Sequence, residues 1–196
     1  MFEKIEKLPD DPILGILTSY RNDDNPKKID LSVGVYKDED GLTPIFDAVK
    51  KAESKKLSEE TSKTYTSIEG DPVFCEFIQK LVLGDDHVVI KEKRSGAVST
   101  PGGSGALRVA GEVINGWKPG TNLWVSTPSW PNHIPLLGTA GLTVKEYPYY
   151  DGINHVIKTD EMLTQISKLT KDDILLLHAC CHNPSGADLD FETWKE

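Results

Sequence analysis

The chain has 196 residues and a formal net charge of −9, from 22 basic and 31 acidic side chains. This charge repels nucleic-acid phosphates and anionic lipid surfaces, so we expect no nucleic-acid and no membrane partner. Apolar residues make up 38% and charged residues 27%, and every apolar run is shorter than the roughly 18 residues of a membrane span. The composition therefore indicates a globular chain.

Cysteine use and the first residues of the sequence bear on location. Cys180 and Cys181 are adjacent and Cys75 stands alone, which does not suit a disulfide framework. The opening Met-Phe-Glu-Lys-Ile-Glu-Lys has no apolar core of the kind that a secretory signal contains. We expect reduced thiols and a cytoplasmic location.

The first 60 residues predict a strand, a turn and a helix. Residues 29–36 alternate apolar with small or polar side chains, as a short strand does, and a turn-forming Lys-Asp-Glu-Asp-Gly segment follows. Pro44 stands where a helix is expected to begin. Ile45, Val49 and Leu57 then recur at helical spacing, beside lysines that we expect to face solvent.

A second helix is predicted to begin at Pro72. Asp71 is a suitable N-cap, Pro72 suits the first helical position, and Gly84 is expected to end the helix. Its apolar positions form one stripe, which consists of Phe74, Phe77, Ile78 and Leu81.

From residue 97 onward, short β segments alternate with helical ones. The β segments are 97–99, 122–126, 142–147 and 174–179, and the helices follow Gly103 and lie near 132–140 and 160–169. This alternation predicts the α/β class, with a mostly parallel sheet and helices on both faces. Ligands of such sheets bind at the carboxyl ends of the strands, where the loops at 101–105, 128–133 and 182–186 fall.

The first of these loops has the composition of an anion site. Gly102 and Gly103 let backbone N–H groups approach a phosphate, Ser104 adds a hydroxyl, and the following helix contributes its positive amino terminus. Arg108 replaces the third glycine of a dinucleotide-binding motif, and no P-loop lysine follows. The alternative is a tight glycine turn without a ligand.

The other two loops offer a flat ring and an amide. Trp130 lies between two prolines and is suited to stacking on an aromatic ring, with the His133 imidazole nearby, although a tryptophan in the core is the alternative. Asn183 follows a buried strand and can bond a ligand oxygen, or can belong to an ordinary Asn-Pro turn.

Four residues of metal-binding types, two histidines and two cysteines, also lie close together in this last segment. His178, Cys180, Cys181 and His182 fall within five positions, but strand geometry directs alternate side chains to opposite faces. Their spacing differs from that of structural zinc sites, so we expect no metal.

Taken together, these segments resemble the class I aminotransferases, in the branch that acts on aspartate and aromatic amino acids. The resemblance extends over essentially the whole chain and rests on five motifs in the same order. They are 31–38 (LSVGVYKD), Tyr65 with 68–70 (IEG), 100–108 (TPGGSGALR), 128–133 (PSWPNH) and 178–186 (HACCHNPSG).

The resemblance implies a fold and an activity. The fold is that of the large domain of type I pyridoxal-phosphate-dependent transferases, truncated, with residues 1–45 as an N-terminal arm and small-domain segment and 46–196 as the first part of the cofactor-binding domain. The activity is transfer of an amino group between an amino acid and a 2-oxo acid such as 2-oxoglutarate, with pyridoxal 5'-phosphate as cofactor. Aspartate is the preferred substrate and an aromatic amino acid the other option.

The resemblance also assigns residues. The cofactor-binding residues are Gly102, Gly103, Ser104, Trp130, Asn183, Tyr65 and His133, and the substrate-binding residues are Gly34, Trp130 and Asn183. Tyr65 resembles a tyrosine that reaches the phosphate of the other subunit, which implies a homodimer; an ordinary partly buried aromatic is the alternative. His133 and His178 resemble imidazoles that support an aspartate at the pyridine nitrogen. Thr127-Pro128 and Asn183-Pro184 match cis peptide bonds.

The resemblance places the main catalytic groups after residue 196. These are the Schiff-base lysine, the aspartate at the ring nitrogen and the arginines that bind substrate carboxylates, which Arg21, Arg94 and Arg108 do not match. We therefore expect no catalytic residue within this chain, which would be inactive alone although its full-length parent is an enzyme. The rivals are a truncated, non-catalytic paralogue that binds phosphate compounds or a partner aminotransferase subunit, and a structural protein.

Overall fold

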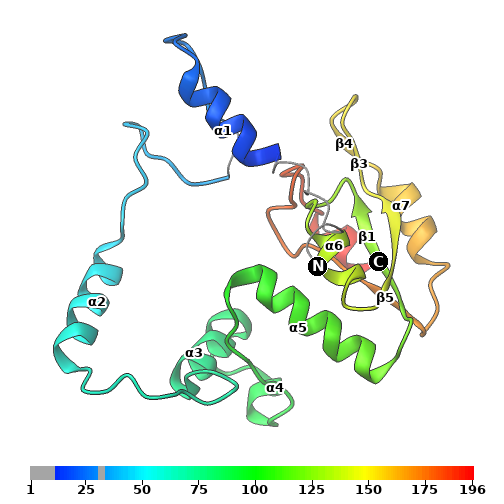
Figure 1. Ribbon diagram of the computed structural model, residues 1–196. Coiled ribbons are helices and arrows are strands. Elements are labelled where there is room, and N and C mark those ends of the chain that lie inside the picture. Colours follow the sequence, from blue (N-terminus) through cyan, green and yellow to red (C-terminus); the bar gives the residue numbers. More distant parts are fainter. Residues whose placement is uncertain (1–11, 31–33) are drawn as a thin grey trace, which may run out of the picture. The chain divides into compact units, whose positions relative to one another are not determined.

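The computed structural model describes residues 12–30 and 34–196, which fall into two compact units, Met1–Thr64 and Tyr65–Glu196 (Figure 1). The first unit contains helices α1 (Pro12–Asn22) and α2 (Asp47–Glu59). The second contains the sheets and the other helices. The predicted boundary between residues 45 and 46 concerns the domains of the full-length protein and stays a prediction.

The first unit differs from the prediction in two places. Residues 29–30 and 34–36 belong to no strand, and residues 31–33 lie outside the described residues. Helix α2 begins at Asp47 rather than at Pro44, because Phe46 is still extended (ψ 141°) and the acidic Asp47 suits the positive end of the helix. An alternating pattern alone does not make a strand, since a strand also needs a hydrogen-bonding neighbour.

Helix α3 (Pro72–Leu83) begins and ends as predicted. The Asp71 carboxylate accepts hydrogen bonds from the backbone N–H groups of Val73 (2.8 Å) and Phe74 (3.0 Å). Gly84 follows at a φ of +91°, which glycine adopts without strain. The short helix α4 (Val88–Lys91) comes next.

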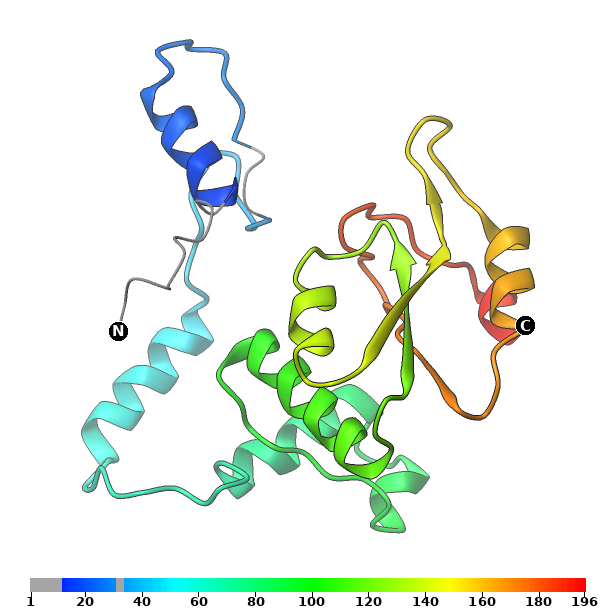
Figure 2. The same cartoon turned by 45° about the vertical axis from the view of Figure 1, so that its right-hand side comes forward.

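Three parallel strands form the main sheet, in the order β2-β1-β5 (Figure 2). They are β1 (Asn122–Thr127), β2 (Thr143–Pro148) and β5 (Asp173–Leu175). The predicted strand at 97–99 is wrong: the Ser99 N–H donates to the Glu69 carbonyl oxygen (2.7 Å), and no described strand lies beside this segment.

Helices cover both faces of the sheet, which confirms the α/β class. On one face Leu123 and Val125 of β1 pack with α5 (Gly102–Trp117) and α6 (His133–Gly138). On the other face Trp124 packs with Met162 of α7 (Thr159–Ile166) and with Tyr147 of β2. The alternation of side chains along β1 therefore separates two apolar clusters, and Figure 2 shows the helices on either side.

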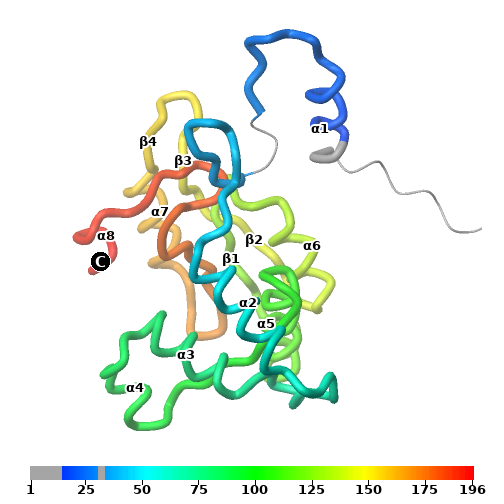
Figure 3. Tube along the Cα trace, turned by 90° about the vertical axis from the view of Figure 1, so that its left-hand side faces the viewer, coloured from blue at the N-terminus to red at the C-terminus, as the bar shows by residue number. Residues whose placement is uncertain are grey.

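The remaining elements extend the second unit. An antiparallel hairpin of β3 (Tyr150–Asp151) and β4 (Val156–Ile157) projects beyond the carboxyl end of β2 (Figure 3). The short helix α8 (Phe191–Lys195) follows the last loop and is capped by Asp190, whose carboxylate accepts from the Thr193 N–H (2.8 Å). No described helix has both the length and the apolar character to cross a bilayer.

Candidate functional site

The loop after β1 fixes an indole beside a buried imidazole. Thr127-Pro128 is a cis peptide bond, as predicted. His133, the first residue of α6, is 7% exposed, and its Nδ1 lies 2.8 Å from the Ser129 hydroxyl oxygen. The half-buried Trp130 ring meets the His133 ring edge to face, with centroids 5.3 Å apart. Trp130 therefore lies at the edge of the core rather than within it.

The loop after β5 brings a second group of side chains to the same place. The His178 ring lies 5.2 Å from the His133 ring, and Nδ1 of His178 accepts a hydrogen bond from the Asn183 backbone N–H at 3.1 Å. The Asn183-Pro184 bond is also cis, as predicted. Trp130, His133, His178 and Asn183 thus form one continuous row of contacts between two strand-end loops.

His182 anchors this second loop to the sheet. His182 is 2% exposed. The Nε2 atom of its ring lies 2.9 Å from the Ser126 hydroxyl oxygen, and the Nδ1 atom lies 2.7 Å from the Ser185 hydroxyl oxygen. The ring also stacks on Tyr149, with centroids 3.9 Å apart. The Asp188 carboxylate accepts from the His182 N–H (2.8 Å). The sequence indicated His182 only as a potential metal ligand. Nothing in its local pattern predicted that the side chain anchors this loop to the sheet.

Burial keeps the three imidazoles neutral. Burial lowers the pKa of His182 to about 4, with a further contribution from His178. Burial also lowers the pKa of His133 and that of His178. A neutral imidazole donates from one ring nitrogen and accepts at the other. Because His178 accepts at Nδ1, its proton resides on Nε2, so this nitrogen is a donor.

The Nε2 donor of His178 is buried and has no hydrogen-bond partner among the described residues. Leaving a buried N–H unpaired costs about 1–3 kcal/mol, so such groups normally have an acceptor. The His178 Nε2–H is therefore a candidate donor to a bound acceptor.

The glycine-rich loop forms the amino terminus of α5. Gly102 (φ +66°), Gly103 and Ser104 are exposed, and no side chain caps the helix. The first N–H groups of a helix lack intrahelical partners and can bind an anion. No hydrogen bond or ring contact among the described residues joins this loop to Trp130 or Asn183, so the convergence of all three loops stays a prediction.

Two other predicted site residues are Tyr65 and Gly34. The Tyr65 side chain is fully exposed (101%), which disagrees with the alternative of a partly buried aromatic and leaves the ring free to contact another molecule. Gly34 belongs to the first unit and is exposed. Its predicted position against the substrate stays a prediction.

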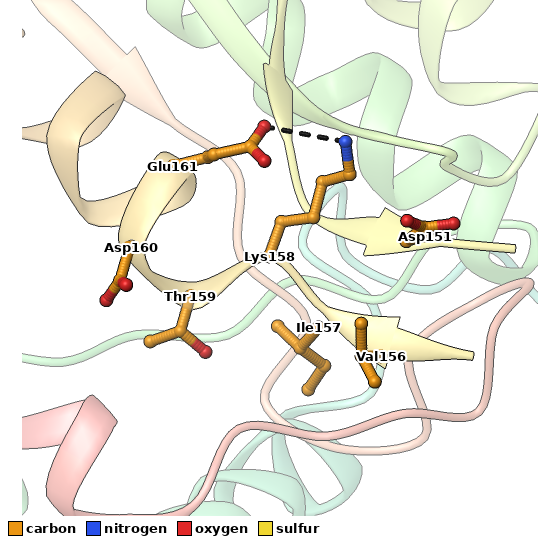
Figure 4. A pocket seen from close by; sticks show the side chains of 7 residues that line it. All are labelled: Asp151, Val156, Ile157, Lys158, Thr159, Asp160 and Glu161. Atoms are coloured by element: carbon orange, nitrogen blue, oxygen red, sulfur yellow. Dashed lines mark hydrogen bonds and ion pairs between the residues drawn. The ribbon is translucent and has the colours of Figure 1, made fainter. Parts of the chain in front are cut away.

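A cavity of about 300 Å³ lies beside the β3–β4 hairpin (Figure 4). Three carboxylates line it, those of Asp151, Asp160 and Glu161, and its one cation, Lys158, lies 3.5 Å from the Glu161 carboxylate. This lining disfavours a phosphate, and no aromatic ring contributes to it. The strand-end loops therefore remain the predicted cofactor site, and this cavity does not fit the cofactor.

Comparison with known proteins identifies the class of protein that this fold and these loops define. Residues 26–196 match the family model for aminotransferase class I and II. The chain belongs to this family.

Two curated relatives show how similar the chain is to individual aminotransferases. The chain is 46% identical over 195 residues to an aspartate aminotransferase of Salmonella typhi, covering 100% of this chain and 49% of that protein. It is 45% identical over 194 residues to an aromatic-amino-acid aminotransferase of Pseudomonas aeruginosa, covering 99% of this chain and 48% of that protein. The chain thus spans about half the length of the curated relatives that it matches.

Solved structures show the same relationship. An aromatic amino acid aminotransferase from Psychrobacter sp. B6, crystallised with aspartic acid, superposes with a TM-score of 0.92 at 41% identity, covering 100% of this chain and 49% of that one. An aromatic-amino-acid aminotransferase from Burkholderia pseudomallei, covalently bound to pyridoxal phosphate, superposes with a TM-score of 0.94 at 38% identity. This match covers 99% of this chain and 49% of that one. The α/β architecture is therefore that of the family.

Proposed function

We propose that the full-length protein transfers an amino group between an amino acid and a 2-oxo acid, with pyridoxal phosphate as cofactor. Aspartate is the proposed amino acid, with an aromatic amino acid as the other option, and 2-oxoglutarate is the proposed acceptor. Support comes from the family membership and from relatives named for both substrates. The observation that carries the proposal is the contact row from Trp130 to Asn183 with its unpaired His178 donor.

The residues of this row fit pyridoxal phosphate chemically. The half-buried indole of Trp130 offers a flat face for a heterocycle, and the uncapped α5 amino terminus suits a phosphate. The buried Nε2–H of His178 suits a carboxylate, the group that would stabilise a protonated ring nitrogen. When bound, the cofactor supplies an electron sink for the substrate carbon.

Each residue then has a distinct task. Gly102, Gly103 and Ser104 hold the phosphate through backbone N–H groups and a hydroxyl. Trp130 fixes the plane of the ring, and the Asn183 amide bonds a ring oxygen and a substrate carboxylate. The His133 ring meets the Trp130 ring edge to face, so it positions the indole.

The proposal also assigns roles to Gly34 and Tyr65, which make no contact of the row among the described residues. Gly34 lies against the substrate, and Tyr65 contacts the phosphate of a second subunit in a homodimer. The exposed Tyr65 ring supports this role, because an inter-subunit contact needs an accessible side chain. Free cysteines support a reducing, cytoplasmic location.

The cofactor site can be tested on this chain by equilibrium dialysis against pyridoxal phosphate. Losing a stacked ring removes about 0.5–1.5 kcal/mol, so Trp130→Ala should weaken binding roughly 3- to 10-fold. The matched control is Trp117→Ala, at the exposed end of α5 (79% exposed). Equal losses in both variants would contradict the assignment of Trp130. Inorganic phosphate should compete with pyridoxal phosphate for the unsubstituted chain, and it should compete less for the Ser104→Ala variant.

A second measurement addresses activity. The chain is mixed with pyridoxal phosphate, aspartate and 2-oxoglutarate, and oxaloacetate is followed against a sample that contains free cofactor only. We expect no turnover above that background, because the groups assigned to the chemistry do not match any residue of this chain. Turnover above background would refute this expectation, whereas phosphate binding without dependence on Trp130 would favour a non-catalytic phosphate-binding paralogue.

A further inference from the structure

The loop after β5 carries a second feature, the adjacent thiols of Cys180 and Cys181. Both are free and exposed, and Cys180 acts electrostatically on the Cys181 thiol. Neither belongs to the proposed cofactor contacts. We propose that this pair is a binding site for monosubstituted trivalent arsenic, R–As(OH)₂, held through two As–S bonds. This inference goes beyond the proposed function and does not depend on it.

The fold fixes the backbone turn that carries the second thiol. Cys181 has a φ of +53°, in the left-handed region that few non-glycine residues adopt. The Asp188 carboxylate fixes this conformation by accepting from the backbone N–H groups of Cys181 and His182, both at 2.8 Å. The buried His182 ring then ties the turn to Ser126 of β1. A pair held in this way loses little conformational entropy when a ligand bridges it.

Geometry disfavours a direct disulfide between the two sulfurs. Adjacent Cα atoms are about 3.8 Å apart, whereas disulfide-bonded cysteines normally have Cα atoms about 4.4–6.8 Å apart. A bridging atom between the sulfurs lengthens the ring and relieves this constraint. The pair is therefore better arranged to chelate a ligand than to oxidise.

The number of ligands disfavours a zinc ion and suits trivalent arsenic. Among the described residues, no cluster of three or more His, Cys, Asp or Glu side chains is arranged to hold a metal. A structural zinc ion needs four ligands, but a trivalent arsenic atom that already carries one organic group needs only two. Thiols are the soft ligands that such an atom prefers.

The binding step balances without a redox partner. Each thiol proton leaves with one arsenic-bound hydroxyl as water, so two As–O bonds break, two As–S bonds form and arsenic stays trivalent.

Phenylarsine oxide, which hydrates to R–As(OH)₂ in water, tests the proposal on the reduced chain. Intact-mass measurement should show one phenylarsenic group per chain, gained with the loss of one hydrogen from each of two thiols. Removing one arm of a chelate forfeits its effective concentration, so Cys180→Ser and Cys181→Ser should each bind about 100-fold more weakly. Cys75→Ser is the matched control, because Cys75 is 8% exposed and lies in α3, and it should bind like the parent.

Several outcomes would overturn the proposal. Parent-like binding by either Cys180→Ser or Cys181→Ser would show that the thiols do not act as a pair, and loss of binding in Cys75→Ser would place the site elsewhere. Removal of the arsenical by glutathione as readily as by dithiothreitol would also exclude a chelate. Finally, rapid formation of an internal Cys180–Cys181 disulfide with oxidised glutathione would refute the geometric argument.

Discussion

Replacing Gly111 by alanine should destabilise the contact between α5 and α6. A Cβ atom added at Gly111 would lie 2.8 Å from the Cβ of Ala140 and 3.3 Å from Cδ2 of Leu137. The Ala140 Cβ is fixed to the backbone and cannot rotate away, so one of the two segments must shift. Such overpacking costs about 1–3 kcal/mol, while alanine returns up to about 1 kcal/mol of helix propensity. We expect a net loss of about 1 kcal/mol in the free energy of unfolding.

The same helix offers a matched control. A Cβ added at Gly116 would meet nothing within 4 Å, so Gly116→Ala should gain up to about 1 kcal/mol from helix propensity alone. The double variant Gly111→Ala with Ala140→Gly removes the clashing atom. It should therefore be more stable than the sum of the two single changes predicts.

Urea unfolding, followed by far-UV circular dichroism, measures the unsubstituted chain, the three single variants Gly111→Ala, Gly116→Ala and Ala140→Gly, and the double variant. The reasoning requires that the transition midpoints of Gly111→Ala and Gly116→Ala move in opposite directions from that of the parent. If both midpoints rise by similar amounts, Gly111 has room for a side chain, and α5 and α6 do not pack as described.

Three further predictions concern pH, the sheet and a helix cap. Because the pKa of His182 is lowered to about 4, the unfolded chain is the better proton acceptor, so the contribution of His182 to stability is full above pH ~6.5 and should fall by about 3 kcal/mol as the pH drops to about 4. The urea midpoint of His182→Gln should depend less on pH across this window, and the same pH dependence as in the unsubstituted chain would contradict the assignment. Asp173→Asn should lower the urea midpoint and shift Trp124 fluorescence to longer wavelength, because the Asp173 carboxylate accepts from the Trp124 indole (3.1 Å) and from Asn122 (2.9 Å); an unaltered Trp124 spectrum would show that this bond is unimportant. Asp71→Ala should cost about 1 kcal/mol by removing the α3 cap, whereas Asp71→Ser should restore most of the loss, and equal stability of Ala and Ser variants would argue against capping.

Local sequence determined much of the second unit. The Asp71-Pro72 start and Gly84 end of α3 follow from capping rules that involve neighbouring residues only. The parallel sheet with helices on both faces follows from the alternation of β and helical segments after residue 97. The short segment at 97–99 was predicted wrongly, because a strand depends on a partner that its own residues cannot specify.

The candidate site was also predicted in part from the sequence and decided in part by the tertiary structure. Local composition predicted the glycine loop before α5, Trp130 and Asn183 as separate candidates, and the family resemblance predicted the two cis peptide bonds that the structure contains. Tertiary structure alone decided which side chains meet. The parallel pairing of β1 with β5 places their following loops together, so that Ser126 bonds His182, 56 positions later in the chain. Contacts at that separation depend on strand register and burial, and for this reason the neutral histidine row and the unpaired His178 donor became visible only in the folded chain.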